Sequence, residues 1–138
     1  SALDVSVQAQ VIQVLDEIRR QAGISLIFIS HDMQVVRALA DNVIVMYLGQ
    51  IQEKGSVSQV LSSPKHPYTK ALIKSIPTLD REHPPEILEG DWASQGIPQT
   101  GCRFAPRCPQ KTSLCTEGVI PLEMVDSVLC RCILNRST

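Results

Sequence analysis

The first 55 residues constrain the fold most, because two helical patterns alternate there with two continuous apolar runs. Apolar residues recur at helical spacing over Val5–Ala22, and an uninterrupted apolar run follows at Ser25–Ser30. The order repeats with a helix expected over Asp32–Ala40 and a second apolar run over Asn42–Leu48. Runs of this kind are typical of strands buried on both faces. The alternation predicts an α/β fold in which helices cover a mainly parallel sheet.

Shorter elements are expected after this point. Gly49 predicts a turn into a return strand over Gln50–Glu53, and short helices are expected over Ser56–Leu61 and Tyr68–Ile76. A sheet of two or three strands this apolar needs neighbours that the sequence does not contain, so we expect an incomplete sheet. Prolines and glycines are frequent in residues 77–100, which predicts an irregular arm.

Charge and hydropathy exclude two classes of partner. The formal net charge of −1 argues against a nucleic-acid binder with a wholly basic surface. No apolar run approaches the roughly 18–20 residues that a bilayer crossing requires, so no direct insertion into a membrane is expected.

Five cysteines gather in the last third of the chain, at Cys102, Cys108, Cys115, Cys130 and Cys132. The sequence has no signal-peptide pattern, so we expect the cytosol, where clustered thiols bind metal or stay free. Structural zinc sites usually contain a C-x(2–4)-C knuckle, which is absent here. Metal binding is the better hypothesis, and reduced, unligated thiols are the alternative.

Four segments in order along the chain, Ser1–Asp4, Ser30–Asp32, His66–Pro77 and Gly101–Pro109, resemble motifs of ABC-type ATPases of the oligopeptide/dipeptide importer family. Ser1–Asp4 resembles the D-loop, and Ser30–Asp32 resembles the switch-histidine loop that comes after a strand. His66–Pro77 (HPYTKALIKSIP) resembles the extension of the peptide-importing members, and Gly101–Pro109 resembles their C-terminal cysteine motif. The resemblance identifies the chain as the C-terminal part of an ATP-binding subunit.

The resemblance implies roles for two of these segments. His31 is expected to be catalytic, contacting the γ-phosphate of ATP and helping to align the attacking water. Phosphoryl transfer depends mainly on positioning and electrostatic stabilisation, which an imidazole donor provides. The D-loop residues Ser1, Ala2, Leu3 and Asp4 are expected at the interface between two ATPase subunits.

Three family motifs are missing from the sequence. It contains no G-x-x-x-x-G-K-[ST] phosphate loop, no Ser-Gly-Gly-Gln signature segment and no Asp-Glu pair before the D-loop. We therefore expect a chain that does not hydrolyse ATP alone, whereas the full-length protein would use ATP and Mg²⁺. Enzyme status thus depends on the full-length protein.

The cysteine spacing matches a four-cysteine pattern that in this family often holds a [4Fe–4S] cluster. The implied ligands are Cys102, Cys108 and Cys115, with either Cys130 or Cys132 as the fourth, and zinc is the less favoured metal. Val128-Leu129-Cys130 resembles the family's approach to its last cysteine, whereas Cys132-Ile133-Leu134 resembles the family's last cysteine and the residues after it. The sequence therefore leaves open whether Cys130 or Cys132 is the fourth ligand.

The sequence is thus interpreted as three regions: residues 1–62 from the ATPase domain, 63–100 as the importer-type extension and arm, and 101–138 as an irregular cysteine-rich tail. The expected partners are a second ATPase subunit and two membrane permeases, at the cytoplasmic face of the inner membrane. The expected function is energy coupling in import of oligopeptides, dipeptides or related small solutes. Two alternatives are a stand-alone iron–sulfur or zinc module on an ATPase-like scaffold, and a folded but inactive remnant.

Overall fold

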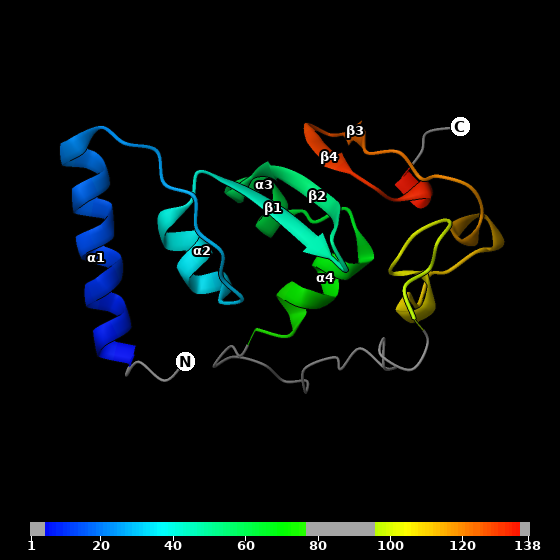
Figure 1. Ribbon diagram of the computed structural model, residues 1–138, viewed down its shortest axis with the longest axis horizontal. Coiled ribbons are helices and arrows are strands. Elements are labelled where there is room, and N and C mark those ends of the chain that lie inside the picture. The colour runs from blue at the N-terminus through cyan, green and yellow to red at the C-terminus, as the bar shows by residue number, and fades with distance from the viewer. Residues whose placement is uncertain (1–4, 77–95, 136–138) are drawn as a thin grey trace. The chain divides into compact units, whose positions relative to one another are not determined.

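The computed structural model describes residues 5–76 and 96–135 of the chain (Figure 1). It divides into two compact units, residues 1–41 and 42–138, which we describe separately. The proposed D-loop residues, Ser1, Ala2, Leu3 and Asp4, lie outside the described residues.

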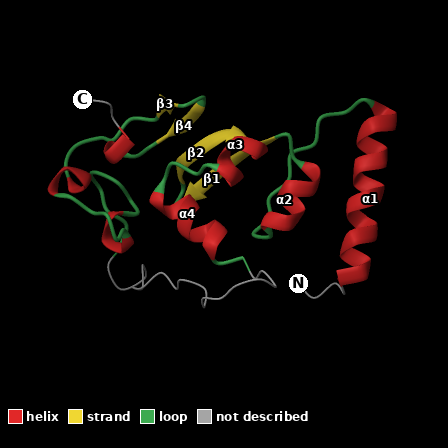
Figure 2. Ribbon diagram, turned by 180° about the vertical axis from the view of Figure 1, so that it is seen from behind, coloured by secondary structure: helices red, strands yellow, loops and turns green. Residues whose placement is uncertain are grey.

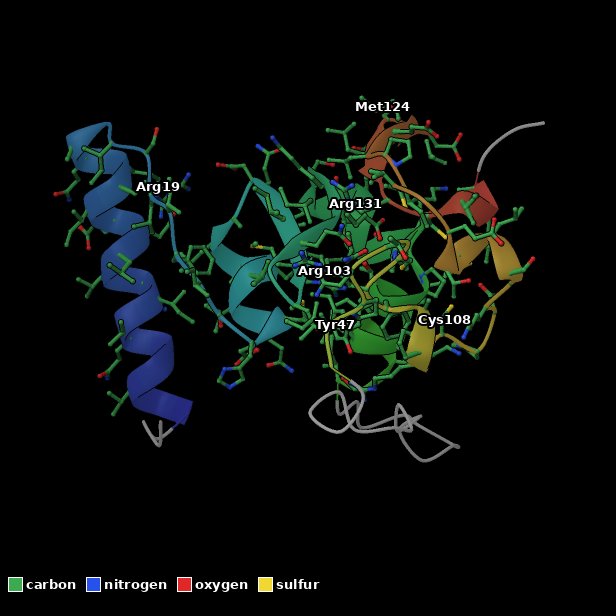
Figure 3. The ribbon with its side chains drawn as sticks, turned by 45° about the vertical axis from the view of Figure 1, so that its right-hand side comes forward. Arg19, Tyr47, Arg103, Cys108, Met124 and Arg131 are labelled. Carbon is green, nitrogen blue, oxygen red and sulfur yellow. The ribbon has the colours of Figure 1, made fainter. Side chains whose placement is uncertain are left out.

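The first unit begins with a long helix, α1 (Val5–Ala22), as its apolar spacing predicts. Asp16 organises the exposed side near its C-terminus, because its carboxylate lies 2.8 Å from the guanidinium of Arg19 and 2.6 Å from that of Arg20. Arg19, labelled in Figure 3, also reaches Asp41 at 3.2 Å. These ion pairs join the last turns of α1 to the end of the unit.

The segment between the two helices of this unit corrects the predicted parallel strand. No strand forms over residues 24–32, and Ile27 and Ile29 are 95% and 100% exposed. An apolar run becomes a strand only where a neighbouring strand pairs with its backbone, and the described residues offer this segment none. The next helix, α2 (Met33–Leu39), does form as predicted, with the Asp32 side chain accepting from backbone N–H groups of its first turn.

The second unit is built on one antiparallel sheet, in the order β1-β2-β4-β3 (Figures 1 and 2). The strands are β1 (Asn42–Tyr47), β2 (Gln50–Ser56), β3 (Glu123–Val125) and β4 (Val128–Cys130). The mainly parallel sheet that the sequence predicts is therefore not the sheet described here. Two of its strands come from the cysteine-rich tail, where none was predicted, so the tail completes the sheet.

β1 is buried on one face and not on both, contrary to the prediction. Val43, Val45 and Tyr47 are buried, whereas the residues between them are exposed. Alternation of this kind is normal for an antiparallel strand with one covered face. The covering layer includes α3 (Val57–Ser62), whose Val60 is fully buried.

α4 (Pro67–Lys74) begins at the proline of the HPYTK motif. Its N-cap is His66, whose Nδ1 accepts a hydrogen bond from the N–H of Tyr68 at 3.0 Å. A proline fits the first turn of a helix because it has no N–H to leave unpaired there. Residues 66–68 thus fix both the start of α4 and the direction of the histidine ring.

A tight turn joins β1 to β2 and also anchors the tail. Leu48 and Gly49 both have positive φ angles, 46° and 73°, as a two-residue hairpin turn requires. The Arg103 guanidinium donates a hydrogen bond to the Leu48 carbonyl (Figure 3 labels Arg103 near the Tyr47 end of β1). The tail then continues through short 3₁₀ helices, η1 (Ala105–Arg107), η2 (Ser113–Thr116) and η3 (Ile133–Asn135).

Candidate functional site

Phe104 lies at the centre of an aromatic cluster that holds the tail against the sheet and α4. It is fully buried, and its ring centroid lies 5.3 Å from those of Tyr47 and Tyr68 and 5.9 Å from that of His66. Edge-on and tilted ring contacts at these distances add to the stabilisation from burial alone. The loop that carries the first two cysteines is therefore fixed by the core of the second unit.

Four of the five cysteines, Cys102, Cys108, Cys115 and Cys132, line one small cavity beside this cluster. All five are free thiols. The cavity volume of about 10 Å³ leaves room for about one water molecule. Within residues 5–76 and 96–135, no group of three or more His, Cys, Asp or Glu side chains is arranged to hold a metal ion. The thiols share a cavity without converging on one ion position.

Backbone N–H groups point at all four cavity sulfurs. For three of them the donor lies two residues after the cysteine, in the pairs Phe104 to Cys102, Gln110 to Cys108 and Leu134 to Cys132. For Cys115 the donor is Thr112, whose nitrogen lies 3.5 Å from the sulfur. Burial raises the pKa of Cys102, Cys108 and Cys132, and these N–H groups oppose the shift because they favour the thiolate.

His66 closes the cavity on the α4 side, with Nε2 lying 3.9 Å from the Cys102 sulfur. Because Nδ1 accepts from Tyr68, the ring proton is on Nε2, which donates to the backbone carbonyl of Arg131. Burial lowers the pKa of His66 to about 4, and this hydrogen bond only partly opposes that shift. The imidazole is therefore neutral at physiological pH.

Cys130 lies outside the cavity lining, on the sheet. It is 1% exposed, pairs with Glu53 across the β2–β4 ladder, and its sulfur lies 3.4 Å from the Asn135 side-chain nitrogen. Burial raises the pKa of Cys130 to about 12, and the carboxylate of Glu53 adds to the effect. This thiol stays protonated under ordinary conditions.

Glu53 ties the sheet to the start of α4. It is fully buried, and its two carboxylate oxygens accept from the backbone N–H groups of Lys65 at 2.8 Å and His66 at 3.0 Å. Both orphan donors of the turn before the helix are thus satisfied. The carboxylate holds the His66 ring at the cavity through the backbone that carries it.

The remaining predicted site residue, His31, belongs to the first unit. Its side chain is exposed, and the loop around it is shaped by the Ser30 hydroxyl, which accepts from the N–H of Asp32 at 2.9 Å. The loop precedes α2 directly. The structure thus gives His31 an accessible position.

Sequence reasoning missed Glu53 and the burial of His66. A glutamate in a short polar strand gives no sign that it is buried, because its partners lie 12 and 13 residues further on. The one available signal for His66 was its place inside the HPYTK motif, directly before a proline.

The turn at residues 64–68, α4 and the loop that carries the first cysteines all lie in the segment that matches a known protein family. Residues 52–115 match the family described as "Oligopeptide/dipeptide transporter, C-terminal region". The match covers most of β2, all of α3 and α4, and the first three cysteines. The resemblance found in the motifs is thereby confirmed.

Curated relatives extend the similarity over most of the chain. The oligopeptide transport ATP-binding protein OppF of Salmonella typhimurium is 48% identical over 113 residues, 79% of this chain and 34% of that protein. OppF of Haemophilus influenzae is 46% identical over 125 residues, 88% of this chain and 38% of that protein. The dipeptide transport ATP-binding protein DppF of Haemophilus influenzae is 44% identical over 135 residues, covering 96% and 41%.

The chain spans between a third and about two fifths of the length of these relatives. The activity of a whole subunit can therefore only be proposed for this chain. None of the helices in the described part of the chain has the length and apolarity that a membrane crossing requires.

Proposed function

We propose that the chain is the C-terminal part of an energy-coupling ATP-binding subunit of an ABC importer for oligopeptides, dipeptides or related small solutes. The observation that carries this is the 44–48% identity to OppF and DppF over most of the chain. The full-length subunit would use ATP and Mg²⁺. It would pair with a second ATPase subunit and work beneath two membrane permeases, at the cytoplasmic face of the inner membrane.

His31 is the residue of this chain that acts on ATP in the proposal. Support comes from its exposed position in the loop that leads into α2. The sequence holds no phosphate loop, so the imidazole would act on a nucleotide bound by the rest of the subunit. Asp4 and its neighbours Ser1, Ala2 and Leu3 would lie at the interface with the second ATPase subunit.

The His31→Ala variant of the full-length subunit tests this role. We expect the ATPase rate to fall by about 100-fold or more, since losing one preorganised donor to the transition state has an effect of that order. Nucleotide binding should change little, as measured by fluorescence titration. Gln34→Ala, an exposed change on α2, is the matched control and should retain its rate. An undiminished rate in His31→Ala would contradict the assignment.

We propose a second function for the tail, the binding of an iron–sulfur cluster by its cysteines. Four soft thiolate donors with no carboxylate among them suit iron–sulfur clusters and zinc. In a [4Fe–4S] cluster each thiolate binds its own iron, so the sulfurs stand further apart than around one zinc ion. The cluster is proposed over zinc because the cysteine spacing resembles the four-cysteine pattern of the family and lacks a C-x(2–4)-C knuckle.

The N–H groups that point at the cavity sulfurs fit the same function. Hydrogen bonds to ligand sulfurs stabilise the thiolate form and tune the reduction potential of a cluster. The cavity has room for about one water molecule, so binding requires the loops around it to move outward. Phe104 and the hydrogen bond from the Cys102 N–H to the Cys115 carbonyl hold two of these loops, so cluster binding would have to break or shift these contacts. The cluster would supply a rigid cross-link between four points of the tail.

A further inference from the structure

Arg131 lies between the two candidate fourth cysteines and fixes their directions. Its backbone N–H donates to the Gln52 carbonyl at 2.8 Å. Its guanidinium donates to the carbonyls of Ile51 at 2.9 Å and Ile120 at 2.6 Å. Arg131 is labelled in Figure 3, next to the strands of the tail. Because these three hydrogen bonds hold Arg131 in place, the side chains of Cys130 and Cys132 on either side of it cannot easily exchange positions.

The His66 ring holds the same residue from the other side. Its Nε2–H donates to the Arg131 carbonyl and lies 3.9 Å from the Cys102 sulfur. The His66 ring thus holds the backbone at Arg131 close to the part of the cavity wall that contains Cys102. The next side chain, Cys132, is part of the cavity lining, whereas Cys130 is not.

The two thiols also differ in their neighbours. Cys132 lines the cavity together with Cys102, Cys108 and Cys115. Cys130 is buried on the sheet, where it pairs with Glu53 across the β2–β4 ladder. Cys132 also shares the i+2 backbone N–H donor found at Cys102 and Cys108, whereas the sulfur of Cys130 faces a side-chain amide.

We propose that Cys132, and not Cys130, is the fourth thiol of the cluster site, and that Cys130 is a structural thiol of the sheet. The inference rests on the proposed cluster function of the cavity. It is opposite to the choice that the Val128-Leu129-Cys130 pattern alone would suggest. His66 and Arg131 are positioning residues in this account, because they set which of the two cysteines faces the cavity.

The test compares Cys132→Ser with Cys130→Ser in the full-length protein. Each variant is purified without oxygen, reconstituted with ferrous iron and sulfide, and freed of unbound metal by gel filtration. Losing an outer-shell partner already costs metal sites 10–100-fold in affinity, so losing a ligand should lower retained iron at least about tenfold. We expect that loss, with loss of visible absorption, in Cys132→Ser. Cys130→Ser should retain iron close to the wild-type amount, and circular dichroism confirms that both variants fold.

The outcomes separate this inference from the cluster function itself. Loss of iron in Cys130→Ser alone, or equally in both folded variants, would overturn the choice of Cys132 over Cys130 and leave the cluster function in place. If the wild type takes up no iron, the cluster function fails and the assignment of Cys132 as a cluster ligand fails with it. Mild oxidation of the metal-free protein then tests only the geometry. Disulfides that join Cys132 to Cys102, Cys108 or Cys115, mapped by mass spectrometry, show that Cys132 faces the cavity, and the same disulfides formed by Cys130 show that it does not.

Discussion

Replacing Phe104 by alanine is expected to lower the free energy of unfolding of the second unit by about 3–5 kcal/mol, the usual cost of removing a buried aromatic ring. Phe104 is fully buried and contacts three other rings, so its loss leaves a cavity that the backbone cannot easily fill. The ring joins β1, α4 and the cysteine-bearing loop. Chemical denaturation followed by circular dichroism measures the change.

Leu114→Ala is the matched control for this prediction, because Leu114 also lies in the tail but is 56% exposed. Exposed substitutions usually change stability by no more than about 0.5 kcal/mol. A loss below about 1 kcal/mol in Phe104→Ala would mean that the tail does not pack on the sheet as described.

Gly101→Ala is the second change with a large expected effect. A Cβ at this position would lie 2.3 Å from the Cys115 carbonyl oxygen and 2.8 Å from the Thr116 backbone, and φ is +73°. The same backbone is held by a hydrogen bond from the Cys102 N–H to the Cys115 carbonyl at 2.8 Å, so it cannot simply move away. The left-handed backbone and the overlap together predict a loss of about 3–5 kcal/mol.

Gly118→Ala separates the two causes. Gly118 also has a positive φ, +58°, but a Cβ there meets nothing within 4 Å. It should lose only the conformational part, about 1–2 kcal/mol. Equal stabilities for the two variants in urea unfolding would show that residues 101 and 115 are not in contact.

The helices could be predicted from the sequence because their signals are local. Asp32 and Pro67 stand where the structure has a helix N-cap and a first helical turn. The strand expected at Ser25–Ser30 could not be settled in this way, since a strand needs a neighbour and apolarity alone supplies none. β3 and β4 have three residues each, too few for a period-two pattern to be recognised.

The candidate site was partly predictable for the same reason. The cysteine spacing gave the set of thiols, and the structure places Cys102, Cys108 and Cys115 on one cavity. The choice between Cys130 and Cys132 depends on contacts of Arg131 that reach across 80 residues to Ile51, which no local pattern contains. The buried pairing of Glu53 with the turn before α4 is equally non-local.

The measurement that tests the site most directly is iron, sulfide and zinc analysis of the wild-type full-length protein after anaerobic purification, together with an absorption spectrum. The account predicts about four irons and four sulfides per chain with broad visible absorption. Neither iron nor zinc above background would contradict it, and the four thiols would then be plain side chains of a folded tail. Zinc alone, near one per chain, would contradict the cluster and keep a thiolate metal site.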